Sequence, residues 1–66
     1  MSPEQQRRAL VERVRHEIAL LAEACEFGMA RTGDSERLAR LIAYRDALYQ
    51  VDTSREPVNF PDPPDV

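Results

Sequence analysis

Few residues in this chain of 66 have the types and spacing that chemistry requires. Glu12 and His16 stand four residues apart, so two side chains on one helix face could reach the same metal ion. Two ligands on a helix surface make a weak site, and no third residue is placed to complete it. His16 is therefore expected to be a solvated histidine. The single cysteine, Cys25, falls in register with apolar residues, so we expect a buried small apolar side chain rather than a reactive thiol.

The remaining candidates for chemistry are also better explained by packing. Tyr44 and Tyr49 are five residues apart within an apolar helical pattern, where aromatic residues are more often part of a core than of a binding box. The sequence has no glycine-rich phosphate loop, no nucleophile elbow and no paired carboxylates. We expect a protein that is not an enzyme, with no cofactor, no metal and no small-molecule substrate.

Charge and hydropathy narrow the choice of partners. Nine basic residues face twelve acidic ones, for a net charge of −3. Nucleic acids and anionic membrane surfaces both favour basic proteins, so neither is expected as a partner. No apolar run approaches the ~20 residues that span a bilayer, and the N-terminus has no basic-then-apolar signal. These features predict a soluble protein of a reducing cytoplasm.

The element that must position the first half of the chain is a helix from residue 2 to about residue 27. Ser2 is a favourable N-cap, Pro3 suits the first helical position, and Gln5 has the spacing of a capping box. Gly28 supplies the left-handed residue that commonly follows a helix. The start and stop signals therefore agree on one long helix.

Apolar residues in this helix recur at steps of three and four, which is the a/d spacing of a coiled-coil seam. The seam consists of Val11, Val14, Ile18, Leu21 and Cys25. A second stripe, confined to the C-terminal half of the helix, contains Leu20, Ala24 and Phe27. A seam of this kind predicts packing against another helix.

After a turn at residues 31–35, a second helix is expected from about Asp34, as its N-cap, to about Gln50. Four of the five prolines stand in the last ten residues and predict an extended tail. Phe60 has no use in a bare linker, so we expect it to lie on the helices and cover part of the second one. The expected organisation is a helical hairpin domain at residues 1–54 and a proline-rich tail at residues 55–66.

These elements predict an all-α fold, an antiparallel two-helix hairpin with a long first helix. At 1.5 Å per residue the first helix is ~37 Å long and the second ~24 Å. The second helix then covers only the C-terminal two-thirds of the first, and the seam at Val11 and Val14 extends past the hairpin. An uncovered apolar seam indicates self-association or packing against a further segment of the chain, and a homo-oligomer is expected.

The C-terminal third resembles the corresponding region of the tail fibre assembly chaperones of tailed bacteriophages. The motif positions that carry the resemblance are Tyr44, Arg45, Leu48, Val51, Asp52, Thr53, Ser54, Pro57, Phe60 and Pro61. Upstream, Ile18, Leu21, Ala24 and the run from Phe27 to Ala30 resemble the family as well. Leu41 and Phe60 stand where the family usually carries tryptophan. The similarity spans roughly residues 18–64.

The resemblance implies function by protein–protein binding: the family helps the distal tail fibre protein to fold and trimerise. It implies the fibre protein as partner and the host bacterial cytoplasm as location, with some members remaining on the fibre tip. Full-length members carry a further N-terminal portion, so the chain is expected to be a fragment or a short relative. The alternative is a stand-alone, antitoxin-like helical interaction or regulatory module. A fibre gene or a toxin gene beside this one would distinguish the two.

Overall fold

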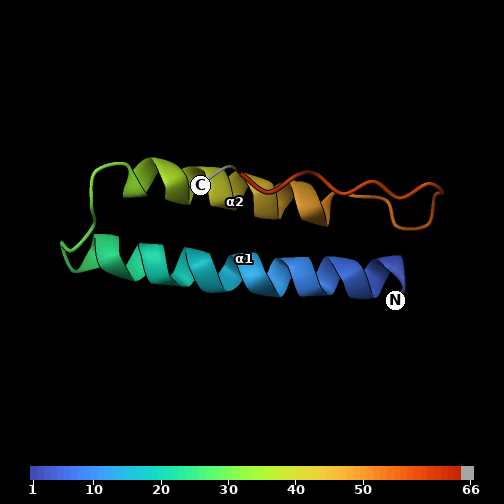
Figure 1. Ribbon diagram of the computed structural model, residues 1–66, viewed down its shortest axis with the longest axis horizontal. Coiled ribbons are helices and arrows are strands. Elements are labelled where there is room, and N and C mark those ends of the chain that lie inside the picture. Colours follow the sequence, from blue (N-terminus) through green and yellow to red (C-terminus); the bar gives the residue numbers. More distant parts are fainter. Residues whose placement is uncertain (65–66) are drawn as a thin grey trace.

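The computed structural model describes residues 1–64, which form two antiparallel helices, α1 (Pro3–Glu26) and α2 (Asp34–Tyr49), followed by an extended tail (Figure 1). Within these residues there are no strands. The helices lie side by side in a rod with extents of 43 × 16 × 16 Å. The expected all-α helical hairpin is therefore confirmed. No helix in the described part is long and apolar enough to cross a membrane.

The start of α1 follows the sequence signals. The backbone N–H of Gln5 donates to Ser2 Oγ (3.1 Å), and the N–H of Ser2 donates to Gln5 Oε1 (3.0 Å). These two bonds form a reciprocal capping box, and Pro3 occupies the first helical position. Two N–H groups that the helix leaves unpaired are satisfied in this way, which fixes where α1 begins.

The end of α1 depends on Gly28, which has a φ of +71°. With Gly28 in this left-handed conformation, the N–H of Met29 donates to the carbonyl of Ala24 (2.8 Å). The N–H of Gly28 donates to the carbonyl of Cys25 (3.3 Å). The pair of bonds is a Schellman motif. A side chain at position 28 would be strained, so glycine is required for the chain to leave the helix here.

The expectation that Asp34 caps α2 is wrong. The N-cap is Gly33, with a φ of +90° and no side-chain cap, and Asp34 is the first helical residue. The Asp34 carboxylate instead accepts a hydrogen bond from the N–H of Arg31 (2.8 Å). The side chain is therefore used by the turn that precedes the helix. Its negative charge still lies in the first turn of α2, where the helix dipole favours it.

The core lies between the two helices. Its buried members are Val11, Val14, Leu41, Tyr44 and Leu48, and the partly buried Leu10, Ile18, Leu21 and Phe60 pack against them. Leu48 has no exposed surface at all, so it lies at the centre of this cluster. Seam residues of α1 thus pack against Leu41, Tyr44 and Leu48 of α2.

The expectation that Val11 and Val14 extend past the hairpin is also wrong, since only 6% and 4% of their surfaces are exposed. The sixteen residues of α2 span ~24 Å, which reaches sixteen residues back along α1 from Glu26, to Val11. Beyond that point the tail takes over, because Arg7 donates from Nη1 to the carbonyl of Val51 (2.9 Å). The same polypeptide therefore covers its own seam.

The tail continues past the end of α2 and then folds back. Glu56, Pro57 and Val58 line a hollow together with Pro3 and Gln6 at the start of α1. The chain then returns along α2 (Figure 1). This return places Phe60 against the core cluster, as expected from the sequence. The organisation into a hairpin domain at residues 1–54 and a tail at residues 55–66 stays a prediction. Residues 65 and 66 of that tail lie outside the described part.

Candidate functional site

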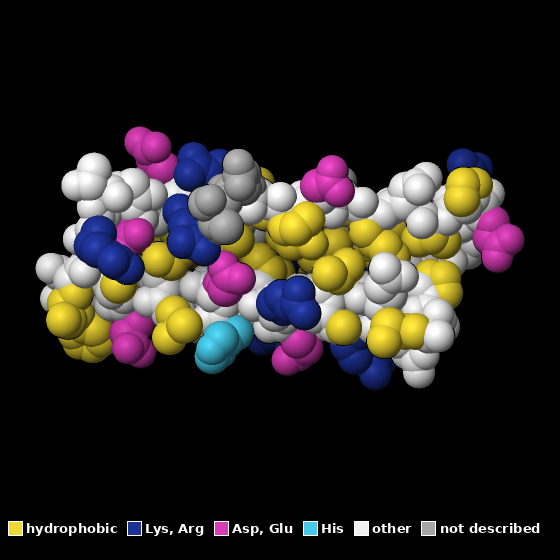
Figure 2. Space-filling view, viewed as in Figure 1, with side chains coloured by type: hydrophobic (Ala, Val, Ile, Leu, Met, Phe, Trp, Pro, Cys, Tyr) yellow, Lys and Arg dark blue, Asp and Glu magenta, His cyan; other side chains and the backbone are white. Residues whose placement is uncertain are grey.

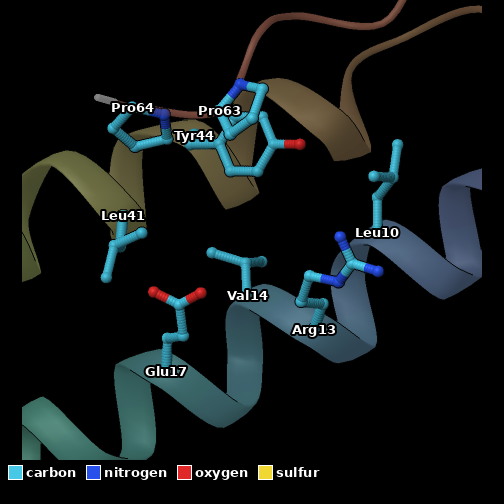
Figure 3. A pocket seen from close by; sticks show the side chains of 8 residues that line it. All are labelled: Leu10, Arg13, Val14, Glu17, Leu41, Tyr44, Pro63 and Pro64. Carbon is cyan, nitrogen blue, oxygen red and sulfur yellow. The ribbon is translucent and has the colours of Figure 1, made fainter. Parts of the chain in front are cut away.

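A groove lies where α1, α2 and the tail meet (Figure 3). We call it the tail groove, and its volume is about 520 Å³. It is lined by Leu10, Arg13, Val14, Glu17, Leu41, Tyr44, Pro63 and Pro64. This volume falls within the range of about 300–1,000 Å³ that is common for ligand pockets. The lining is largely apolar, so contact with an apolar group is the interaction it favours.

Helical spacing brings the lining residues of α1 together. Positions 10, 13, 14 and 17 recur at steps of three and four and so lie on one flank of that helix. Leu41 and Tyr44 are three residues apart on α2 and face this flank from across the core. Pro63 and Pro64 complete the groove on the side of Tyr44 (Figure 3). Because the tail folds back, a segment far from α1 in the sequence becomes part of the same site.

Charges of both signs lie at the rim of the tail groove. Arg13 and Glu17 project from α1 beside Val14 (Figure 3). Glu17 Oε2 also accepts a hydrogen bond from Arg37 Nη2 (3.3 Å), an ion pair that joins the two helices across this face. The rim can therefore offer a positive and a negative group to the same polypeptide segment.

The phenol of Tyr44 is the one titratable group in the apolar part of the tail groove. Burial raises its pKa above the ordinary value of 10.0; nearby Arg13 opposes this effect and Asp62 adds to it. The hydroxyl is thus protonated at neutral pH and can donate a hydrogen bond. No imidazole or thiol lies among the lining residues to form a nucleophile–base pair with it.

The described residues do not form a metal site. Within 1–64, no three His, Cys, Asp or Glu side chains come together in a way that could hold a metal ion. His16 is exposed on α1, and Cys25 is a half-buried free thiol. What the tail groove can do is bind by apolar contact, a phenolic hydrogen bond and two rim charges.

The predicted self-association seam is not an open surface. Val11 and Val14 are buried, and Ile18 and Leu21 are half-buried and pack against the core. Cys25 is half-buried as well. A second chain could reach Val11 and Val14 only by displacing α2 or the tail, because these two side chains are almost fully covered. Whether the chain associates stays a prediction.

Several motif positions meet in the core or at its edge. Tyr44 and Leu48 are buried, and Phe60 packs against them from the tail. Arg45 is half-buried on α2 and lies 3.4 Å from Asp46 Oδ1 through its Nη2 atom. Pro61 is half-buried beside Phe60 in the sequence. Phe60 is thus the motif position through which the tail contacts the core.

The other motif positions direct the chain out of α2. The carbonyl of Val51 accepts from Arg7, and Asp52 Oδ1 accepts from both the backbone N–H and the hydroxyl of Ser54. The hydroxyl and then the N–H of Ser54 lower the pKa of Asp52 below its ordinary value of 3.8. The half-buried Thr53 stands between these two residues. The exposed Pro57 reaches the start of α1. The run therefore forms the turn that begins the return of the tail.

Four residues outside the motif positions line the tail groove or bind the tail, and they were not predicted from the sequence. Leu10, Arg13 and Glu17 were not singled out, although Leu10 is the apolar neighbour of the seam and the other two have i,i+4 spacing. Arg7 was also missed, because its partner is a backbone carbonyl 44 residues away. No sequence pattern signals such a contact.

Comparison with known proteins identifies one family. Residues 2–65 match the family model described as Caudovirales tail fibre assembly protein, lambda gpK. Neither the curated proteins nor the solved structures give a match. The family match spans nearly the whole chain, including both helices and the motif positions of the tail.

Proposed function

The chain belongs to the Caudovirales tail fibre assembly protein family, and on that premise we propose that it binds the phage tail fibre protein directly and assists its folding and trimerisation. Family membership supports a role in tail fibre assembly. The finer proposal is a chaperone that acts by protein–protein binding. It acts in the cytoplasm of the infected host, where fibres are made, and a copy that stays bound would be carried on the fibre tip.

The tail groove is the observation that carries this proposal. Its floor is apolar, and one of its walls is an extended segment of the chain itself, Pro63–Pro64, which lies beside Tyr44. A site that already holds one extended segment has the shape to hold a second one alongside. Unfolded fibre chain, before it trimerises, offers extended apolar segments of this kind. We therefore assign the tail groove to an extended segment of the fibre protein.

The chemistry of the rim fits a client that is bound and later released. Arg13 and Glu17 are at the edge of the groove rather than in its floor, so they orient a segment and steer its approach without a large desolvation cost. Apolar contacts supply most of the attraction. Binding of this strength suits a factor that protects a folding intermediate and then yields to the contacts of the trimer.

Co-expression with the fibre protein of the same phage tests the proposal. The readout is the yield of soluble fibre trimer, measured by size-exclusion chromatography with light scattering. The double variant Arg13→Glu/Glu17→Gln changes the rim of the tail groove. The matched control, Arg15→Glu/Glu12→Gln, makes the same changes on the opposite, charged flank of α1.

We expect wild-type chain and the control to give soluble trimer. The rim variant should weaken binding of the fibre protein by about tenfold, which is ~1.4 kcal/mol, and so lower the yield of trimer. Both double variants should keep the helical circular dichroism of the wild type, because all four side chains are exposed or half-exposed. Equal yields from the rim variant and the control would refute the assignment to the tail groove. Fibre that trimerises equally well without the chain would refute the chaperone function.

A further inference from the structure

The returning part of the tail, residues 58–64, lies along α2 (Figure 1). Phe60 packs there against the core cluster, which includes Leu41 and Tyr44. We call the helix surface under this part of the tail the tail seat. Figure 2 shows hydrophobic side chains along the line where α1 faces α2 and the tail, so this face of the molecule offers apolar contacts to a partner.

Hydrogen bonds do not fasten this part of the tail to the helices. Among the described residues 55–64, no backbone or side-chain group forms a hydrogen bond with α1 or α2. The hydrogen bond from Arg7 to Val51 lies before this stretch, and the ion pair of Arg55 with Asp52 (3.7 Å) stays within the turn. Four residues of the stretch are prolines, which have no N–H to donate. Apolar contact therefore holds the segment on the tail seat.

Burial also makes the tail the part of the molecule that opens most readily. All five buried residues belong to α1 and α2, whereas Phe60 and its best covered neighbours in the tail are only half-buried. Few buried contacts and a solvent-exposed backbone are typical of segments that open locally while the rest of a protein stays folded. Release of the tail breaks no hydrogen bond within a helix. The tail seat can therefore be uncovered without unfolding the hairpin.

We propose that the tail seat is a second binding surface for the fibre protein, on which an extended fibre segment with a proline and an aromatic residue takes the place of the tail. This inference rests on the proposed function and extends it. The tail groove holds a fibre segment beside the tail, and the tail seat adds a position under it. The tail itself shows which kind of segment the surface accepts.

The pattern of the tail defines the chemistry of the segment that replaces it. Val58, Phe60 and Pro61 are half-buried, whereas Asn59 and Asp62 are exposed. A replacing segment thus needs apolar residues, one of them aromatic, toward the helices and polar residues toward water. Proline suits such a segment because the polyproline II conformation is preformed and loses little entropy on binding.

The tail groove beside the tail seat gives the fibre segment a means to compete with the tail. A short turn at residues 50–55 joins the tail to α2, so the effective concentration of the tail at its seat is on the order of millimolar. A separate segment in dilute solution competes poorly with it. A fibre chain already held in the tail groove presents its adjoining residues at a similar effective concentration. Binding in the tail groove therefore comes first, and exchange of the tail follows.

A peptide with the sequence of residues 56–64 is the probe that tests this proposal. It is titrated to about 5 mM into the isotope-labelled full chain, and NMR shifts, expected at Leu41 and Tyr44, give the dissociation constant. We expect Phe60→Ala, whose own tail is released, to bind the peptide at least about tenfold more tightly than the wild type, because its tail no longer competes. Tyr49→Ala, the matched control that removes an exposed ring from α2, should bind it as the wild type does.

A second readout keeps the test decisive if Phe60→Ala is partly unfolded. The peptide should then restore the helical circular dichroism of this variant and raise its Tm, because a ligand of the folded state stabilises that state. The same peptide with alanine in place of its phenylalanine should do neither. A peptide that binds Phe60→Ala no better than the wild type, or that binds neither at about 5 mM, overturns the proposal.

Competition by the distal part of the fibre protein identifies the occupant of the tail seat. We expect the fibre protein to displace the peptide from Phe60→Ala. Fibre protein that leaves the peptide in place overturns the assignment of the tail seat, even where it binds the tail groove. Failure of the proposed function gives a different result, in which Arg13→Glu/Glu17→Gln yields as much fibre trimer as its control.

Discussion

Replacing Phe60 by alanine removes the side chain through which the tail packs on the helices. Phe60 is half-buried and contacts the cluster that contains Leu48 and Tyr44. Of its two neighbours in the tail, Asn59 is exposed and Pro61 is half-buried. We expect Phe60→Ala to release the tail from α2 while both helices stay formed.

The size of the effect follows from burial. Deleting a fully buried phenylalanine side chain costs about 3–5 kcal/mol, and a half-buried one at the edge of the core should cost about 1–3 kcal/mol. A chain of this length has a free energy of unfolding of about 3–10 kcal/mol. Each kcal/mol lowers the Tm of a domain this small by about 4–8 °C. Loss of one side chain from the tail should therefore remove a substantial share of the stability of the helices.

Urea denaturation followed by circular dichroism at a helical wavelength measures this free energy, and the signal comes from the helices rather than the tail. Tyr49→Ala is the matched control, because it also deletes an aromatic ring, but one that is more than half exposed. We expect the control to change the free energy of unfolding by less than about 0.5 kcal/mol. A Phe60→Ala variant as stable as Tyr49→Ala would refute the docking of the tail on the core.

Further predictions concern the fastening of the tail and the core. Arg7→Met keeps the apolar stem but removes the hydrogen bond that ties the tail to α1, and should cost about 1 kcal/mol in urea denaturation, while Arg8→Met on the exposed flank should cost almost nothing. The pKa of Asp52 is lowered in the folded chain, so the stability that its carboxylate contributes is fully present above pH 3.8 and is lost as the pH falls through the folded pKa. The free energy of unfolding should therefore fall less on acidification in Asp52→Asn than in the wild type. The raised pKa of Tyr44 works in the opposite direction: stability should be constant below pH 10.0 and fall as the pH rises through the folded pKa, and Tyr44→Phe should abolish that fall. Leu48→Ala should cost about 2–5 kcal/mol in urea denaturation, a large share of the stability of so small a domain, because Leu48 is fully buried.

Local features of the fold could be predicted from the sequence because they depend on residues close together in the chain. Ser2 and Gln5 are three residues apart, and Gly28 stands two residues after Glu26, the last residue of the helix. Helix capping at such positions needs no knowledge of the rest of the fold. The second cap was predicted wrongly because Asp34 had two possible partners, its own helix and the turn before it, and Gly33 made the turn available.

Contacts between distant residues could not be predicted from spacing alone. The valines of the seam were expected to stay uncovered, but α2 is long enough to reach back to Val11, and the tail covers only what lies beyond. The hydrogen bond from Arg7 to Val51 and the positions of Pro63 and Pro64 depend on the path of the tail. The tail groove shares this dependence, since three separate segments form it. Phe60 was predicted to lie on the helices because an aromatic residue among prolines has no role in solvent.

Mapping the binding of the fibre protein onto this chain tests the central claim most directly. In an NMR titration of the isotope-labelled chain with the distal part of the fibre protein, we expect shifted resonances at Leu10, Arg13, Glu17 and Tyr44, which line the tail groove. Resonances of Glu4, Arg8 and Arg15 on the opposite flank should stay in place. Shifts confined to that flank, or no shifts at saturating fibre protein, would contradict the account.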